Sequence, residues 1–229
     1  MDKRYQLSEA EHSQGLAWHL QAPPTGTTDA LNTLAAALRD AGLCGPWRDE
    51  QLAVTNPAGE VIGTVERGAV RVLGVATRAV HLVGLAPDGR MWVQKRSLTK
   101  PNNPGLWDTL MGGMVSAADS LPQALARETW EEAGLRVTDL QSLHAAGRIT
   151  IRRPVSEGYM VEHIDVFEAV VPAVLEQRVV GADAAAGAAA GAFSISCACA
   201  SVVSEMRSPP SIRDALRSRS ASPIFLRPM

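Results

Sequence analysis

The chain has 229 residues, of which 46% are hydrophobic and 20% charged, and its formal net charge at neutral pH is −2. This is an ordinary globular composition, and the length allows one substantial domain with a smaller companion. Because no surplus of basic residues exists to neutralise a phosphate backbone, we expect no nucleic-acid partner. No apolar run approaches the roughly 20 residues of a membrane helix, so we expect no membrane association either.

The N-terminus and the cysteines point to a cytoplasmic location. The first 20 residues carry charges of both signs and no apolar core, unlike a secretory signal. The three cysteines, Cys44, Cys197 and Cys199, do not form the even set that is typical of a disulfide framework. We therefore expect the reducing environment of the cytoplasm.

Residues 1–75 are predicted to form a small unit of one helix followed by strands. Apolar residues recur at helical spacing after Thr28, and the pattern stops at Gly42 and Gly45. Turn signals then separate three short β-prone runs. These runs are residues 51–56, 60–67 and 69–76.

Residues 76–180 are predicted to form the main domain. Two β-prone runs flank a turn signal at residues 87–89 and predict a hairpin. A helix is expected to begin at a capping box made by Ser120 and Gln123 and to end at Gly134. Further strands are expected within residues 135–155 and 159–172. Strands on both sides of a single helix favour an α+β sandwich over a parallel doubly wound sheet.

Residues 181–229 are predicted to be a flexible C-terminal tail. An Ala/Gly run is followed by a stretch rich in Ser, Arg and Pro, with little apolar periodicity. Such a tail would leave the sheet poorly covered, and aggregation or a homodimer over the exposed face is the expected consequence. Two origins of the tail stay open, a natural disordered segment and a shifted reading frame in a GC-rich gene.

Three carboxylates share one face of the predicted helix. Glu128, Glu131 and Glu132 are related by i, i+3 and i+4, and Arg127 stands four residues before Glu131. Like charges at this spacing repel one another, and a divalent cation would relieve the repulsion. Mg²⁺ prefers carboxylate, water and phosphate oxygens, so the glutamates are candidate metal ligands. A solvated, salt-bridged helix face is the alternative.

The surrounding residues resemble the Nudix box, G-x5-E-x7-R-E-U-x-E-E-x-G-U, in which U is a bulky apolar residue. Asp119 stands where the family has Glu, and Thr129 stands where it has an apolar residue. The other seven of the nine defined positions match, namely Gly113, Arg127, Glu128, Glu131, Glu132, Gly134 and Leu135. The resemblance implies a Nudix α/β/α sandwich with a mixed sheet. It also implies hydrolysis of a diphosphate by water attack on phosphorus, dependent on Mg²⁺ or Mn²⁺.

Carried over to this chain, the resemblance assigns roles to the residues of the box. The implied metal ligands are Glu128, Glu131 and Glu132, together with the Gly113 carbonyl. Arg127 would orient the glutamates. The general base varies across the family and often lies outside the box. The candidates for it are Glu157, Glu162 and Asp165, and we place Glu162 in the expected catalytic set.

The segment that precedes the box provides candidates for binding the substrate. Arg96 and Lys100, with Lys95 beside them, would contact a diphosphate. A solvated hairpin end is the alternative for these basic residues. Trp107 would be either a core residue or a stacking surface for a ring.

Residues 47–172 are similar to one Nudix subgroup, the one related to the segment fused to fungal thiamine pyrophosphokinase. This resemblance implies thiamine diphosphate or a damaged analogue as the small-molecule substrate, with release of phosphate. A hydrolase of other nucleoside-diphosphate derivatives and a catalytically silent nucleotide-binding module are the alternatives. Isopentenyl-diphosphate isomerase shares the fold but needs a catalytic cysteine, and none lies between Cys44 and Cys197.

Overall fold

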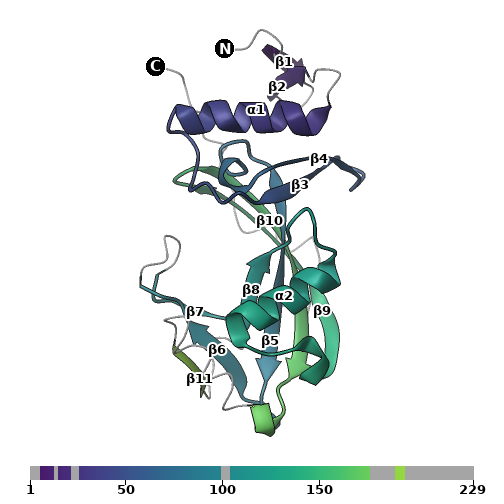
Figure 1. Ribbon diagram of the computed structural model, residues 1–229, viewed down its shortest axis with the longest axis vertical. Coiled ribbons are helices and arrows are strands. Elements are labelled where there is room, and N and C mark those ends of the chain that lie inside the picture. Colours follow the sequence, from purple (N-terminus) through teal and green to yellow (C-terminus); the bar gives the residue numbers. More distant parts are fainter. Residues whose placement is uncertain (1–5, 13–14, 22–25, 99–103, 176–188, 194–229) are drawn as a thin grey trace, which may run out of the picture. The chain divides into compact units, whose positions relative to one another are not determined.

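The computed structural model describes residues 6–12, 15–21, 26–98, 104–175 and 189–193 (Figure 1). All of them belong to one compact unit, Met1–Phe193. In chain order the elements are β1 (Gln6–His12), β2 (Gly15–Gln21), α1 (Thr27–Asp40), β3 (Gln51–Thr55), β4 (Val61–Glu66), η1 (Arg67–Ala69), β5 (Ala76–Leu85), β6 (Met91–Lys95), β7 (Trp107–Asp108), β8 (Met111–Met114), α2 (Leu121–Ala133), η2 (Val137–Asp139), β9 (Gln141–Val155), β10 (Gly158–Val170), η3 (Ala173–Leu175) and β11 (Ala189–Phe193). Among these residues, no helix is both long and apolar enough to cross a membrane.

Helix α1 and the antiparallel β3–β4 pair share a core of their own, separate from that of the main sheet. The helix ends as predicted at Gly42, whose φ of 71° suits a residue without a side chain. Its buried face packs towards β4. The core consists of Ala35, Leu52, Val65, Ala69 and Val70. The predicted helix and the first two predicted strands of this region are confirmed.

The third strand predicted in this region, residues 69–76, is wrong. The chain instead forms the 3₁₀ helix η1 and a turn that ends at Gly74, where φ is 63°, and β5 begins only at Ala76. The cause is the buried carboxylate of Glu66, which caps η1 by accepting a hydrogen bond from the Gly68 N–H group at 3.2 Å. The apolar residues of the run therefore fill the core from a compact turn.

The main sheet is mixed, and the α+β class is confirmed. Its strand order is β11-β6-β5-β10-β9, with β7 beside β6 and β8 beside β5. Strands β5 and β10 are parallel, whereas the other pairs are antiparallel. The hairpin predicted around residues 87–89 is the β5–β6 pair, in which Gly84 lies opposite Trp92.

Helix α2 packs against β8 and β5 and carries the predicted carboxylates (Figure 1). Its start is confirmed, because the Ser120 N–H group donates to Gln123 Oε1 at 2.8 Å, and its end is confirmed by Gly134 at φ 63°. Thr129 is fully buried, and its hydroxyl donates to the Leu125 carbonyl at 2.6 Å. Thr129 therefore serves as the apolar position of the helix with its polar atom satisfied.

Strand β11 falls within the segment that we expected to be a flexible tail. Ala189–Phe193 pair antiparallel with β6 over the whole length of that strand. Backbone hydrogen bonds to an edge strand need no apolar side-chain pattern, so the composition of the segment did not reveal this strand. Residues 176–188 and 194–229 lie outside the described residues, and the predicted domain boundaries stay predictions.

Candidate active site

Arg127 bonds to three carboxylates at once. Its Nε donates to Asp119 Oδ2 at 2.9 Å, and its Nη1 donates to Glu128 Oε1 at 2.9 Å and to Glu131 Oε2 at 3.2 Å. Burial by itself would lower the pKa of Arg127, but the hydrogen bond to Asp119 and the charge of Glu128 outweigh burial and raise it. Asp119, although shorter than the glutamate of the family pattern, therefore still reaches this arginine.

Glu128 is more enclosed than Glu131, with side-chain exposures of 12% and 55%. The carboxyl group of Glu128 lies so close to Gly113 on β8 that a Cβ atom at position 113 would collide with it. Burial raises the pKa of Glu128 in spite of Arg127, and the neighbouring charges of Glu132 and Glu131 raise it further. The glycine at position 113 thus lets a carboxylate and the β8 backbone meet directly.

Glu132 is held by the same strand. Its Oε2 accepts hydrogen bonds from the Gly112 N–H group at 3.0 Å and from Gln94 Nε2 at 3.2 Å. Gly112 in turn lies against His81 on β5, where a Cβ atom would come within 2.7 Å of the imidazole. Because Gly112 and Gly113 have no side chains, the backbone of β8 can lie directly against the carboxylates of α2 and the imidazole of His81.

The oxygen atoms of these carboxylates are suitable ligands for a hard divalent cation. Glu128 and Glu132 present oxygens beside β8, and such oxygens are the ligands that Mg²⁺ and Mn²⁺ prefer. Glu128 and Glu131 are bonded to Arg127, and Glu132 is bonded to Gly112. In the part of the chain that the structure describes, no group of three or more His, Cys, Asp or Glu side chains is already arranged around a metal position.

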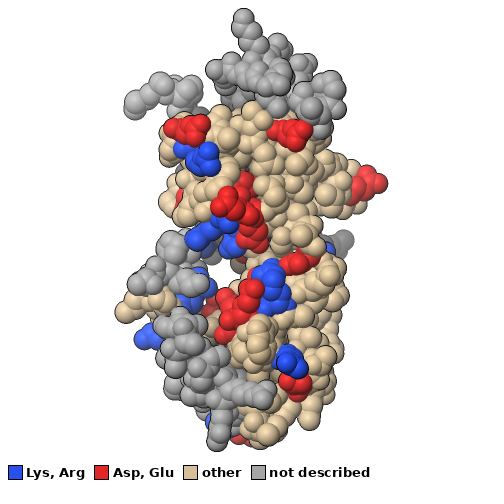
Figure 2. Space-filling view, viewed as in Figure 1, with Lys and Arg blue, Asp and Glu red and all other residues tan. Residues whose placement is uncertain are grey.

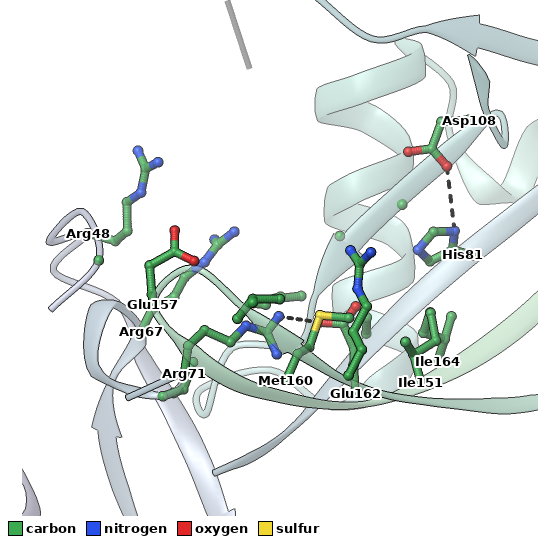
Figure 3. Close-up of a pocket in the computed structure, with 18 of the residues that line it drawn as sticks. Arg48, Arg67, Arg71, His81, Asp108, Ile151, Glu157, Met160, Glu162 and Ile164 are labelled. Carbon is green, nitrogen blue, oxygen red and sulfur yellow. Dashed lines mark hydrogen bonds and ion pairs between the residues drawn. The ribbon is translucent and has the colours of Figure 1, made fainter. Parts of the chain in front are cut away.

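A cavity of about 500 Å³ lies against the same glycines, Gly112 and Gly113 (Figure 3). Its arginines are Arg48, Arg67, Arg71, Arg96 and Arg153, and its carboxylates are Asp108, Glu157 and Glu162. Five positive and three negative side chains give the lining a formal charge of +2, although the whole chain carries −2. In the space-filling view, basic and acidic side chains gather around a hollow below the β3–β4 pair (Figure 2). The cavity therefore favours anionic ligands.

Two of the four residues predicted to bind substrate, Arg96 and Trp107, line this cavity. Arg96 is paired with Asp108 at 2.8 Å. Trp107 is 51% exposed, so the interpretation of it as a core residue is wrong, and Lys95 Nζ lies 6.0 Å from the centre of its ring. Lys100 lies outside the described residues.

The candidate general bases differ in position. Glu162 lines the cavity, and its Oε1 accepts from Arg71 Nη2 at 2.7 Å and from Thr77 Oγ1 at 3.3 Å. Glu157 also lines the cavity. Asp165 is not in the lining. Its carboxylate accepts hydrogen bonds from Arg78 Nε at 2.6 Å and from Arg148 Nε at 2.9 Å. Burial would raise the pKa of Asp165, but the hydrogen bonds from these arginines outweigh burial and lower it. The geometry therefore favours Glu162 and Glu157 over Asp165.

Several lining residues were not predicted from the sequence. Arg153 could have been found, because Ile151, Arg153 and Val155 alternate along β9 and all face the cavity, whereas Arg152 does not. His81 also lines the cavity, with its Nδ1 3.1 Å from Thr109 Oγ1. Three further arginines of the lining follow no local pattern that points to a site: Arg48 precedes β3, Arg67 begins η1, and Arg71 lies in the turn after η1.

Comparison with known proteins supports the assignment of the main domain. Residues 75–183 match the family model of the NUDIX domain. The uncharacterised Nudix hydrolase PA4841 of Pseudomonas aeruginosa is 35% identical over 90 residues, which are 39% of this chain and 49% of that protein. The uncharacterised Nudix hydrolase SCO1686 of Streptomyces coelicolor is 35% identical over 86 residues, which are 38% of this chain and 48% of that protein. The chain thus spans about half the length of these relatives, and neither name specifies a substrate.

The crystal structure of DR0079 from Deinococcus radiodurans is 25% identical, with a TM-score of 0.43, and the match covers 53% of this chain and 72% of that one. The mixed sheet, the helix α2 and the glutamates on its face agree with the family match over the same residues. Residues 75–183 of this chain form a Nudix domain.

Proposed function

We propose that the protein is a hydrolase of organic diphosphates that depends on a divalent cation, Mg²⁺ or Mn²⁺. The observation that carries the proposal is the arginine-lined cavity beside Gly112 and Gly113, two glycines that also contact the carboxylates of Glu132 and Glu128. A diphosphate in this cavity would have cationic side chains around its oxygens. It would also lie beside β8, the strand whose glycines contact Glu128 and Glu132.

The residues of the chain divide into two groups under this proposal. Glu128, Glu131 and Glu132, with the Gly113 carbonyl, would hold the cation, which when bound polarises phosphate oxygens and activates water. Arg127 donates hydrogen bonds to Asp119, Glu128 and Glu131. When the cation binds, one of these hydrogen bonds would break, and the others would keep the remaining carboxylates in position.

The second group acts on the substrate. Arg96 and Arg71 would bind phosphate oxygens, because both line the cavity as charged donors. Glu162 would accept the proton of the attacking water, since its carboxylate lines the cavity and is oriented by Arg71. The attacking oxygen bonds to one phosphorus of the anhydride, the bridging P–O bond breaks, and the leaving phosphate oxygen takes up the proton that Glu162 accepted. The products are a monophosphate and inorganic phosphate when the diphosphate is terminal, and two monophosphates when both of its ends are substituted.

Two substrate classes are proposed within this chemistry. Thiamine diphosphate or a damaged analogue is the one that the resemblance to the thiamine-pyrophosphokinase-related subgroup suggests. A nucleoside-diphosphate derivative is the alternative. Trp107, half exposed in the lining, would stack on the ring of either.

Release of inorganic phosphate or of monophosphates from a panel of diphosphates, with and without Mg²⁺ or Mn²⁺, tests the proposal. Glu132→Gln should reduce turnover of the best substrate by about 100-fold or more, because it removes a proposed metal ligand. Its thermal unfolding in a chelator should stay within a few degrees of wild type. Glu60→Gln changes an exposed carboxylate on the β3–β4 turn and serves as the matched control. Metal-independent release, or near wild-type turnover by Glu132→Gln, would refute the proposal.

A further inference from the structure

We propose that the cavity contains a second anion subsite, formed by Arg48, Arg67 and Arg153, which binds a phosphate group on the part of the substrate remote from the diphosphate. The inference rests on the proposed function, because it specifies which organic diphosphate the cavity accepts. It depends on the length of the cavity, the distribution of its charges and the rigidity of the segment that carries Arg48 and Arg67.

The cavity is longer than a diphosphate. It follows β10 from Met160, which lies opposite Arg153, to Ile164, which lies beside Ala79 at the β8 end. Four residues of a strand span about 13 Å. Figure 3 shows Arg48 and Arg67 at one end, far from the His81–Asp108 pair at the other. A diphosphate bound beside β8 cannot reach the first end, so the arginines there would contact another part of the ligand.

The charges of the two ends also differ. Towards β8, Arg96 is paired with Asp108, and along β10 Arg71 is paired with Glu162, so each of these arginines has a carboxylate of the lining as its partner. At the remote end neither Arg48 nor Arg153 has an ion pair within the described residues. Arg67 is paired with Glu50 at 2.7 Å, and Glu50 is not in the lining. The lining at this end thus includes three arginines and one carboxylate, that of Glu157.

The segment that presents Arg48 and Arg67 is fixed before any ligand binds. Glu66 is 1% exposed, and its carboxylate accepts from the backbone N–H groups of Arg48 at 2.8 Å, Glu50 at 3.1 Å and Gly68 at 3.2 Å. The Arg67 N–H group donates to the Glu50 carbonyl at 2.8 Å. Guanidinium groups carried on an ordered backbone lose less freedom on binding, which favours a specific anion site over a loose basic surface.

Arginines without a carboxylate partner within the described residues, as Arg48 and Arg153 are here, suit a phosphate and disfavour a cationic group in the same place. The ring system of thiamine diphosphate carries a positive charge. The subsite therefore favours the alternative substrate class, a nucleoside-diphosphate derivative with an additional phosphate on its nucleoside.

Calorimetric binding of two nucleotides to the full chain tests the subsite. ADP and its 3′-phosphorylated form differ by one phosphate, which lies on the ribose and outside the diphosphate arm, and a chelator in the buffer prevents turnover. We expect wild type to bind the 3′-phosphorylated form about 10-fold more tightly or better. Arg48→Ala and Arg153→Ala should each remove most of this difference and leave the affinity for ADP within about twofold.

Arg152→Ala is the matched control, because Arg152 adjoins Arg153 on β9, is exposed and does not line the cavity. It should retain the preference. Equal affinities of wild type for the two nucleotides, no measurable binding of the 3′-phosphorylated one, or an equal loss in Arg152→Ala would overturn the subsite. None of these results bears on the phosphate-release assay, so hydrolysis and the subsite can fail separately.

Discussion

Replacing Glu66 by alanine should strongly destabilise the protein, although the residue lies outside the Nudix domain. The carboxylate is 1% exposed and accepts three backbone N–H groups, those of Arg48, Glu50 and Gly68. Leaving a buried donor without a partner costs about 1–3 kcal/mol. The low end for each donor gives about 3 kcal/mol of unfolding free energy, a large part of the roughly 5–15 kcal/mol that holds a typical domain together. Glu66→Gln keeps one acceptor oxygen and should cost about 1–2 kcal/mol.

Urea denaturation followed by circular dichroism measures these differences. Glu60→Ala, on the exposed turn between β3 and β4, should change the unfolding free energy by less than about 0.5 kcal/mol. Glu66→Gln, where it remains folded, should also lose the preference for the 3′-phosphorylated nucleotide, because the backbone of Arg48 is no longer fixed. If Glu66→Ala unfolds at the wild-type urea concentration, the carboxylate does not hold this segment and the reasoning fails.

Three further substitutions probe other contacts. Gly113→Ala places a Cβ against the carboxyl group of Glu128, so turnover should fall sharply and the unfolding free energy should drop by about 1–3 kcal/mol, as thermal unfolding and phosphate release will show. The pKa of Asp165 lies below its ordinary 3.8, so the contribution of this carboxylate to stability is complete above about pH 4 and is lost as the pH falls further. In acid denaturation, the difference in unfolding free energy between wild type and Asp165→Asn should therefore disappear below that pH. Trp107→Ala should raise KM without changing the urea midpoint, because the ring is half exposed in the lining; an unchanged KM would contradict its role in stacking.

Features set by neighbouring residues could be predicted from the sequence. The start of α2 depends on a side chain three positions away, and its end depends on a glycine, so Ser120, Gln123 and Gly134 were sufficient to define it. The shared face of Glu128 and Glu132 follows from the helical period in the same way. The β5–β6 hairpin needed only its turn residues.

Features set by distant parts of the chain could not be predicted in this way. Residues 69–75 read as a strand because they are apolar and β-branched, but the buried carboxylate of Glu66 imposes a 3₁₀ turn there. Arg67 and Arg71 are separated in sequence from the Nudix box, and only the packing of this turn against the start of β10 brings them to the cavity. In that packing the Tyr159 N–H group donates to the Arg71 carbonyl at 2.9 Å, and Gly158 lies against the same carbonyl, where a side chain would clash. No local spacing rule contains this information.

The carboxylates of α2 and the arginine-rich cavity lining carry opposite charges, which supports a ligand that carries both signs. Asp119, Glu128 and Glu131 are paired with Arg127, and Glu132 adds a fourth negative charge, which leaves a formal −3 on these side chains. The cavity lining carries +2 on the other hand, and both sets contact the glycines of β8. A neutral ligand would gain little from either set, and a free anion would be stabilised by the arginines alone. A divalent cation bound to a diphosphate, as we propose, offers the cation to the carboxylates and the phosphate oxygens to the arginines, so each set of charges stabilises one part of the same complex.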